Sequence, residues 1–130
     1  MFVYKIEPRF CETDALGHVS NTALPKWFEH GREPIFRMFN PALSIADWNL
    51  ILKKMEVDFM AQIYLFKPVE IRTSLSKVGN SSFGVHQEAW QDGKQVAAGD
   101  CVMVHFDYAA QKSAPIPDDI RAQLQAHLAS

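Results

Sequence analysis

A polar, turn-forming loop runs directly into a long amphipathic helix within residues 9–39, and this junction is the feature that most constrains the fold. The helical half carries small or apolar residues at the spacing of one helical face: Leu24, Trp27, Phe28, Gly31, Ile35, Met38 and Phe39. Such a helix is about 24 Å long, which is enough to cross a whole sheet. The unsatisfied N–H groups of its first turn face the polar loop, so we expect chemistry at this junction.

Two prolines bear on the course of this helix. Pro25 falls in the first helical turn if the N-cap is Asn21 or Thr22, and the missing N–H costs little there. Pro34 falls inside the apolar pattern, so we expect either a kink at that position or a second short helix that begins near it.

Five segments alternate apolar and polar residues, as strands with one buried face do. They cover residues 2–7, 54–61, 69–76, 83–90 and 96–107. In the second segment we expect the buried side to carry Met55, Val57, Phe59 and Ala61. In the last segment we expect it to carry Val96, Ala98, Val102, Val104 and Phe106. Asp92-Gly93 predicts a type I′ hairpin turn, and residues 118–129 predict a surface helix.

The order of these elements predicts an α+β fold in a single domain over residues 1–130, with a long helix lying across one antiparallel sheet. One face of one sheet is too small to cover Trp27, Phe28 and Phe36 together. We therefore expect a homodimer, formed through sheet edges.

Composition narrows the class of protein. The chain has 130 residues, of which 48% are hydrophobic, so a core can form without disulfides or metal. The formal net charge of −2 argues against a nucleic-acid-binding protein. Cys11 and Cys101 match neither a disulfide framework nor a zinc site, and we expect two reduced, half-buried thiols.

Targeting and metal-binding patterns are missing from the sequence. No apolar run approaches the roughly 20 residues of a membrane span, and the first residues lack the pattern of a signal peptide. We therefore expect a cytoplasmic protein. The five histidines form no HExxH or similar pair, so neither a metal nor a cofactor is expected.

Residues 14–21, followed by Trp27-Phe28-Glu29 and Arg32, resemble the signature of hotdog-fold acyl-CoA thioesterases of the 4-hydroxybenzoyl-CoA thioesterase-like superfamily. Residues 56–59, 78–83 and 96–104 agree with that resemblance in the same order. It implies a long central helix wrapped by a five-stranded antiparallel sheet. It also implies dimers, often tetramers, that hydrolyse thioesters of coenzyme A or of an acyl-carrier protein.

The resemblance places the catalytic carboxylate on Asp14 and the oxyanion-binding helix N-terminus near Asn21. A carboxylate there can attack the thioester carbonyl or deprotonate a water molecule. One good backbone N–H donor to the oxyanion contributes about 3–4 kcal/mol. The alternative is that Asp14 only caps the loop as an Asx-turn residue.

The neighbours of Asp14 have structural and catalytic interpretations. His18 either orients substrate or water, or is a loop histidine bonded to backbone. Asn21 is more typical of a helix cap than of a catalytic side chain. Glu29 and Arg32 are spaced to form an ion pair along the helix, with Arg9 as a further partner. Glu12 is either solvated or acts electrostatically on Asp14.

A second group of candidates concerns the substrate. Ser81 and Ser82 form a turn that, by the resemblance, lies near the path of pantetheine. Lys77 is a candidate for holding the phosphates of coenzyme A, as are Arg72 and Lys94. For all of these, plain turn chemistry or a solvated surface charge is the alternative.

Two other functions remain open at this point. A hotdog hydratase or dehydratase would need a His/Asp pair across a dimer interface, for which His18 and Asp58 are available. A non-catalytic acyl-CoA-binding dimer would make Asp14 incidental. The identity of the acyl group is left open.

Overall fold

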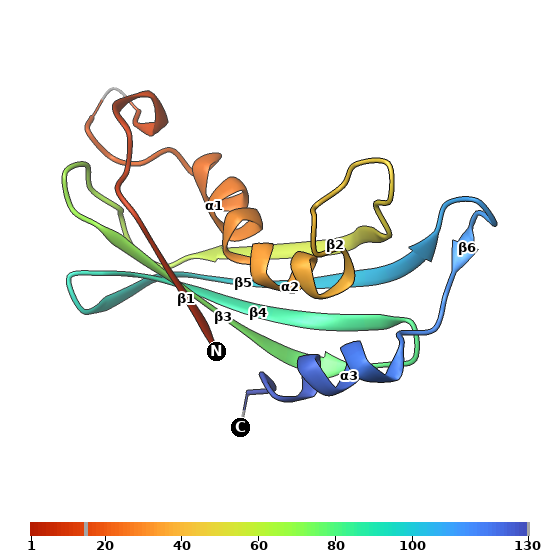
Figure 1. Cartoon of the computed structure of the whole chain (residues 1–130). Helices are drawn as coiled ribbons and strands as arrows, with labels where there is room; N and C mark the ends of the chain where they lie inside the picture. Colours follow the sequence, from red (N-terminus) through yellow and green to blue (C-terminus); the bar gives the residue numbers. More distant parts are fainter. Residues whose placement is uncertain (15, 130) are drawn as a thin grey trace.

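Helix α1 (Ala23–Gly31) lies across one face of a twisted antiparallel sheet in the computed structural model, which describes residues 1–14 and 16–129 (Figure 1). The sheet strands run in the order β1-β3-β4-β5-β2, and a short strand, β6, pairs with β5. Their bounds are β1 Phe2–Ile6, β2 Leu50–Phe59, β3 Val69–Val78, β4 Ser82–Gln91, β5 Lys94–Asp107 and β6 Lys112–Ser113. The predicted α+β arrangement is confirmed, and the two-residue β6 is an addition to it.

The predicted long helix is divided in two. α1 ends at Gly31, and α2 (Glu33–Phe39) follows after Arg32, with Pro34 at its second position. A proline is tolerated there because the first helical N–H groups lack intrahelical partners in any case. Of the two predicted outcomes at Pro34, the second short helix is therefore the one observed. No helix among the described residues has the length and apolar character needed to span a membrane.

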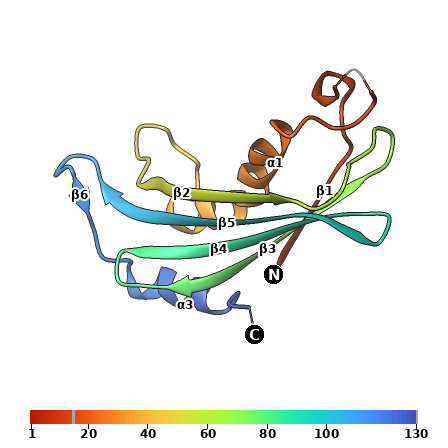
Figure 2. The same cartoon turned by 180° about the vertical axis from the view of Figure 1, so that it is seen from behind.

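Short elements complete the chain. A 3-10 turn, η1 (Phe10–Glu12), opens the polar loop, and α3 (Asp118–Gln125) packs near the end of β3 (Figure 2). The predicted hairpin turn is confirmed, because Asp92 and Gly93 have φ values of 53° and 71°. Both are positive, as a type I′ turn requires.

The expectation that one chain leaves core aromatics exposed is wrong. Trp27, Phe28 and Phe36 are 1%, 0% and 9% exposed within the single chain. Segments outside the sheet provide the missing cover. Glu12 of the polar loop contacts the Trp27 indole, and Trp48 of the connection between α2 and β2 packs edge-to-face on Phe36, with ring centroids 5.5 Å apart. The burial of these side chains therefore gives no reason for dimerisation.

The buried face predicted for β5 is wrong over its second half. Cys101 and Met103 point into the core, whereas Val102 and Val104 are half-buried on the outer face. The pairing of β4 with β5 shifts by one residue near Trp90, which changes the alternation along β5. Cys101 is thus buried and Cys11 exposed, where two half-buried thiols were predicted. Burial raises the pKa of the Cys101 thiol.

Strand β2 also departs from its predicted pattern, because it is an edge strand. It begins at Leu50, earlier than expected, and Phe59 at its end is 53% exposed instead of buried. Met55 and Val57 are partly buried against the core. An edge strand has only one neighbour, so its last residues receive less cover than those of a central strand.

Glycine allows α1 to approach the sheet closely. A Cβ atom on Gly99 would lie 2.8 Å from Phe28 Cε2, and one on Gly31 would lie 2.8 Å from Ile71 Cγ2. Both distances are shorter than an ordinary van der Waals contact. The small residues of α1 and β5 therefore set the distance between helix and sheet.

The outer face of the sheet carries a polar network centred on His86. Its Nδ1 lies 3.0 Å from Asp100 Oδ1 and its Nε2 3.0 Å from Glu88 Oε2. The second oxygen of Glu88 accepts the Trp90 indole N–H at 2.9 Å. Burial lowers the pKa of His86, but the hydrogen bonds to Asp100 and Glu88 outweigh burial, so the pKa is raised above its usual value.

Replacing Gly99 with alanine tests the close contact between helix and sheet. The added methyl group meets the Phe28 ring, so we expect a loss of about 1–3 kcal/mol in the free energy of unfolding, measured by urea denaturation. The double variant with Phe28→Leu, which shortens the side chain in contact, is expected to lose less than the sum of the two single losses. Strict additivity would contradict a direct contact.

The pH dependence of stability tests the His86 network. A raised pKa in the folded state stabilises the protein fully below the unfolded value of 6.5, and this stabilisation is lost as the pH rises through the folded value. We expect the stability difference between the native protein and His86→Gln to shrink by about 0.5–1 kcal/mol from pH 5.5 to pH 9, a modest change because water screens a partly exposed ring. If this stability difference stays the same from pH 5.5 to pH 9, the hydrogen bonds of His86 to Asp100 and Glu88 do not stabilise its protonated form.

Candidate functional site

The polar loop before α1 folds back on itself like a small hairpin. The Ser20 N–H donates to Glu12 O at 2.7 Å, and the Asp14 N–H donates to His18 O at 2.8 Å. Gly17 turns the chain with φ +79°, a conformation that glycine adopts without a steric cost. Asp14 thereby lies at the point where the loop closes, paired with His18, and Ala15, the next residue of the motif, lies outside the described residues.

The Asp14 carboxylate uses its two oxygens differently. Oδ1 accepts the N–H groups of Leu16 at 2.8 Å and His18 at 3.2 Å, so Asp14 does close an Asx turn. Oδ2 accepts no hydrogen bond from the part of the chain that the structure describes, and the nearest charged group is His18 Nδ1 at 4.0 Å. The side chain is 47% exposed. One oxygen therefore holds the loop, while the other is open to a bound molecule.

Asp14 and Asn21 line the same cleft, which has a volume of about 670 Å³. The cleft lies between the polar loop, the start of α1 and the segment that follows β2. Its polar lining is Asp14, Ser20, Asn21 and Gln62, and its apolar lining is Val19, Leu24, Phe59, Met60, Ala61 and Ile63. An apolar wall beside a carboxylate suits a substrate that has an apolar group next to a polar reacting centre.

The first turn of α1 opens toward this cleft without a side-chain cap. The N-cap residue is Thr22, so the prediction that Asn21 caps the helix is wrong. In the part of the chain that the structure describes, the Thr22 side chain makes no capping bond, and Ser20 Oγ accepts the Thr22 N–H at 3.4 Å. Ala23 N–H donates to Ser20 O at 3.0 Å. The described residues offer no acceptor to the N–H groups of Asn21 and Leu24. These two groups are available to an oxygen atom of a bound molecule.

His18 lies beside Asp14 but outside the cleft lining. Its ring packs edge-to-face on Tyr64, with centroids 5.3 Å apart, and the two residues form a backbone bridge. Its backbone N–H and carbonyl oxygen both bond to Asp14. The geometry therefore holds His18 as a support between the Asp14 loop and the segment after β2.

The ion pair expected between Glu29 and Arg32 is not formed. Arg32 is 2% exposed and donates through Nη1 to Gln87 Oε1 of β4 at 3.1 Å. Desolvation lowers the pKa of Arg32. Arg9, the other expected partner, instead pairs with Glu12, with Nη2 and Oε2 3.1 Å apart.

Glu12 is the functional-site neighbour whose role the sequence did not reveal. Burial raises its pKa, but hydrogen bonds from Arg9 and from the Trp27 indole outweigh burial and lower it overall. Its spacing from Arg9 was a usable signal for the ion pair. The contact with Trp27 had no such signal, because the two residues are 15 positions apart.

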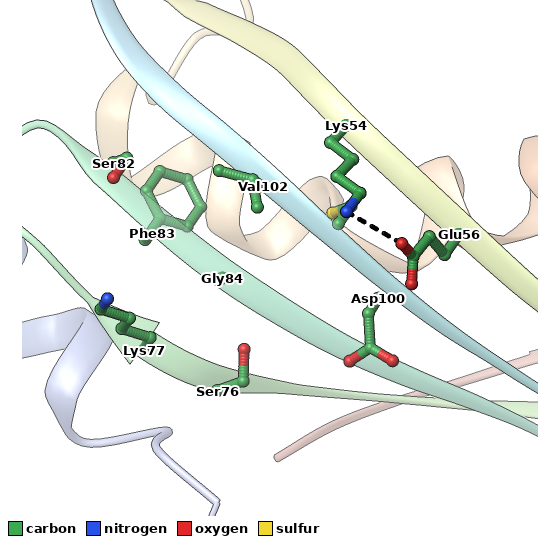
Figure 3. A pocket seen from close by; sticks show the side chains of 10 residues that line it. Lys54, Glu56, Ser76, Lys77, Ser82, Phe83, Gly84, Asp100 and Val102 are labelled. Atoms are coloured by element: carbon green, nitrogen blue, oxygen red, sulfur yellow. Dashed lines mark ion pairs between the residues drawn. The ribbon is translucent and has the colours of Figure 1, made fainter.

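The second group of candidates lies elsewhere. Lys77 and Ser82 line a separate depression of about 290 Å³ on the outer face of the sheet, beside the ion pair of Lys54 and Glu56 (Figure 3). Ser81, in the turn between β3 and β4, accepts the His105 N–H through its carbonyl oxygen. Strand β3 runs from the segment beside the Asp14 loop to this turn. Its ten residues are about 30 Å long, so the turn and Asp14 lie near opposite ends of the strand. One chain therefore does not bring the two groups together.

Comparisons with known proteins identify the family and one curated relative. The model of the thioesterase-like superfamily matches residues 8–124. The uncharacterized protein YsmA of Bacillus subtilis (strain 168) is 26% identical over 124 residues, which make up 95% of this chain and 84% of YsmA.

Two solved structures are closely similar over nearly the whole chain. A predicted thioesterase from Bacillus stearothermophilus has a TM-score of 0.96 and 40% sequence identity, covering 99% of this chain and 97% of that one. A thioesterase from Thermus thermophilus, in complex with coenzyme A and Zn, has a TM-score of 0.85 and 26% identity, covering 95% and 97% of the two chains.

Proposed function

Because the chain belongs to the thioesterase-like superfamily of hotdog-fold thioester hydrolases, we propose that it cleaves acyl-coenzyme A with Asp14 as general base or nucleophile. The observation that carries this proposal is the cleft shared by Asp14 and the uncapped start of α1. Among the described residues, this cleft has a carboxylate oxygen that accepts no hydrogen bond and two N–H donors without an acceptor, which are the groups that thioester hydrolysis needs. The coenzyme A bound to the Thermus thermophilus relative supports coenzyme A as the carrier.

The proposed reaction assigns each group one role. The thioester oxygen binds at the N–H groups of Asn21 and Leu24, which stabilise the negative charge that develops on it. Asp14 takes a proton from a water molecule whose oxygen attacks the carbonyl carbon. The C–S bond then breaks, the thiolate leaves, and the proton on Asp14 returns to the sulfur. In the nucleophilic version, Asp14 attacks directly and water hydrolyses the resulting anhydride.

We extend the proposal to the binding of coenzyme A by Lys77, Ser81 and Ser82. These residues lie too far from Asp14 to serve a substrate in the cleft of the same chain. We therefore assign them to a substrate bound at the cleft of another copy in a dimer or tetramer. The edge strand β2 supports association, because none of the described residues pairs with its outer side and exposed Phe59 and Met60 lie at its end. The free thiols suit a reducing compartment such as the cytoplasm.

Asp14→Asn tests the chemistry. Asparagine keeps the Asx turn but removes the base, so we expect kcat to fall at least about 100-fold in an assay of thiol release from a panel of acyl-coenzyme A substrates. Binding of acyl-coenzyme A is expected to persist. The control is Asp58→Asn. Asp58 is an exposed residue of β2, and this variant is expected to keep turnover. Full activity in Asp14→Asn would remove Asp14 from the mechanism, and no thiol release by the native protein would favour the dehydratase or the non-catalytic binding alternative.

Sedimentation tests the association. We expect the native protein to have the mass of at least two chains, and Phe59→Lys with Met60→Lys to shift it toward one chain, because lysine on an edge strand opposes pairing. Val3→Lys, on the opposite edge strand β1, is the matched control and is expected to leave the mass unchanged. A native protein with the mass of one chain would contradict the proposed assembly.

A further inference from the structure

We propose that Glu12 is a positioning residue that holds the Asp14 loop against helix α1 through its hydrogen bond to the Trp27 indole. The inference rests on the proposed function, because it assigns Glu12 the task of keeping the base and the oxyanion donors at a fixed separation. Glu12 does not line the cleft, so it acts through Asp14 and not on the substrate.

The Glu12 carboxylate is fully engaged. Oε2 accepts the Trp27 Nε1–H at 2.8 Å and Arg9 Nη2 at 3.1 Å. Oε1 accepts the Arg9 backbone N–H at 2.8 Å and Nε at 3.2 Å. The side chain is only 10% exposed, and Trp27 is 1% exposed. Four donors around a nearly buried carboxylate fix both its position and its orientation.

Glu12 connects the two halves of the site along a short path. Its carbonyl oxygen accepts the Ser20 N–H, which closes the loop that carries Asp14 two residues further on. Trp27 lies about one turn beyond Ala23, the first residue of α1. The bond from Glu12 to Trp27 therefore joins the loop of the base to the helix that carries the oxyanion donors. A shift of about 1 Å between reacting groups is enough to cost up to about 100-fold in rate.

The chain contains a matched control for this contact. Glu88 accepts the Trp90 indole N–H at 2.9 Å, a contact of the same chemical type and nearly the same length. It lies on the outer face of the sheet, and neither residue lines the cleft. Substitutions there report what the loss of such a bond does to stability alone.

The kinetic experiment compares Glu12→Gln, Trp27→Phe and their double variant with Glu88→Gln and Trp90→Phe on the best acyl-coenzyme A substrate. We expect each change at Glu12 or Trp27 to lower kcat about 10-fold with KM changed less than about twofold. The double variant is expected to match the worse single variant, because both changes act on the same contact. Phenylalanine removes the indole donor, and glutamine has only one acceptor oxygen for the Trp27 and Arg9 donors that the two carboxylate oxygens share. Both control variants are expected to keep kcat within about twofold. Trp27→Phe keeps the buried ring, so it serves if Glu12→Gln does not fold.

A second readout does not depend on turnover. Hydrogen exchange of the Ser20 and Asp14 backbone N–H groups is expected to accelerate in Glu12→Gln and Trp27→Phe and to stay unchanged in Glu88→Gln. An unchanged kcat or additive losses in an active enzyme would overturn the positioning role. If the native protein hydrolyses no thioester, the proposed function fails, and exchange alone decides whether Glu12 positions the loop. Unchanged exchange would then overturn this inference as well.

Discussion

The packing of α1 onto the sheet through glycine is the constraint on which the rest of the structure depends. Phe28 rests directly on the backbone of Gly99, and Gly31 rests on Ile71, so the helix is held at its minimum distance from the strands. This closeness leaves room for only a few polar groups beneath the helix. Gln87 is one of these polar groups. It donates to Phe28 O at 2.7 Å and to Thr73 Oγ1 at 3.0 Å, and it accepts from Arg32. A buried polar network of this kind fixes the helix in one register.

The site follows from where this helix begins. Because α1 is anchored on the sheet at Phe28, its first turn is fixed next to the segment after β2, where the Val19 N–H donates to Ile63 O at 2.7 Å. That bond brings the Asp14 loop to the same place. The cleft is therefore formed by three segments that are each held by backbone hydrogen bonds.

Local signals in the sequence predicted the parts of the fold and site that local interactions determine. The helical spacing from Leu24 to Phe39, the hairpin at Asp92-Gly93 and the placement of Asp14 beside the helix start all come from neighbouring residues. The core face of β5 was predicted wrongly over its second half because a one-residue shift in the pairing with β4 changes the alternation, and such a shift depends on a second strand. The contacts of Arg32 with Gln87 and of Glu12 with Trp27 were missed because each joins residues far apart in the chain. The separation of Lys77 from Asp14 was not predicted, because it depends on which end of β3 the Asp14 loop packs against.

Pro25 has a consequence for the donors that the start of α1 offers to a substrate. It is the third residue of α1 and has no N–H, so the first helical turn presents a gap in its ring of donors next to Leu24. In the proposed reaction, the carbonyl oxygen binds at Asn21 and Leu24, whose N–H groups come before this gap in the sequence. The proline thus lowers the number of backbone donors that the first turn of α1 can offer to a carbonyl oxygen, although the proline itself makes no bond to the substrate.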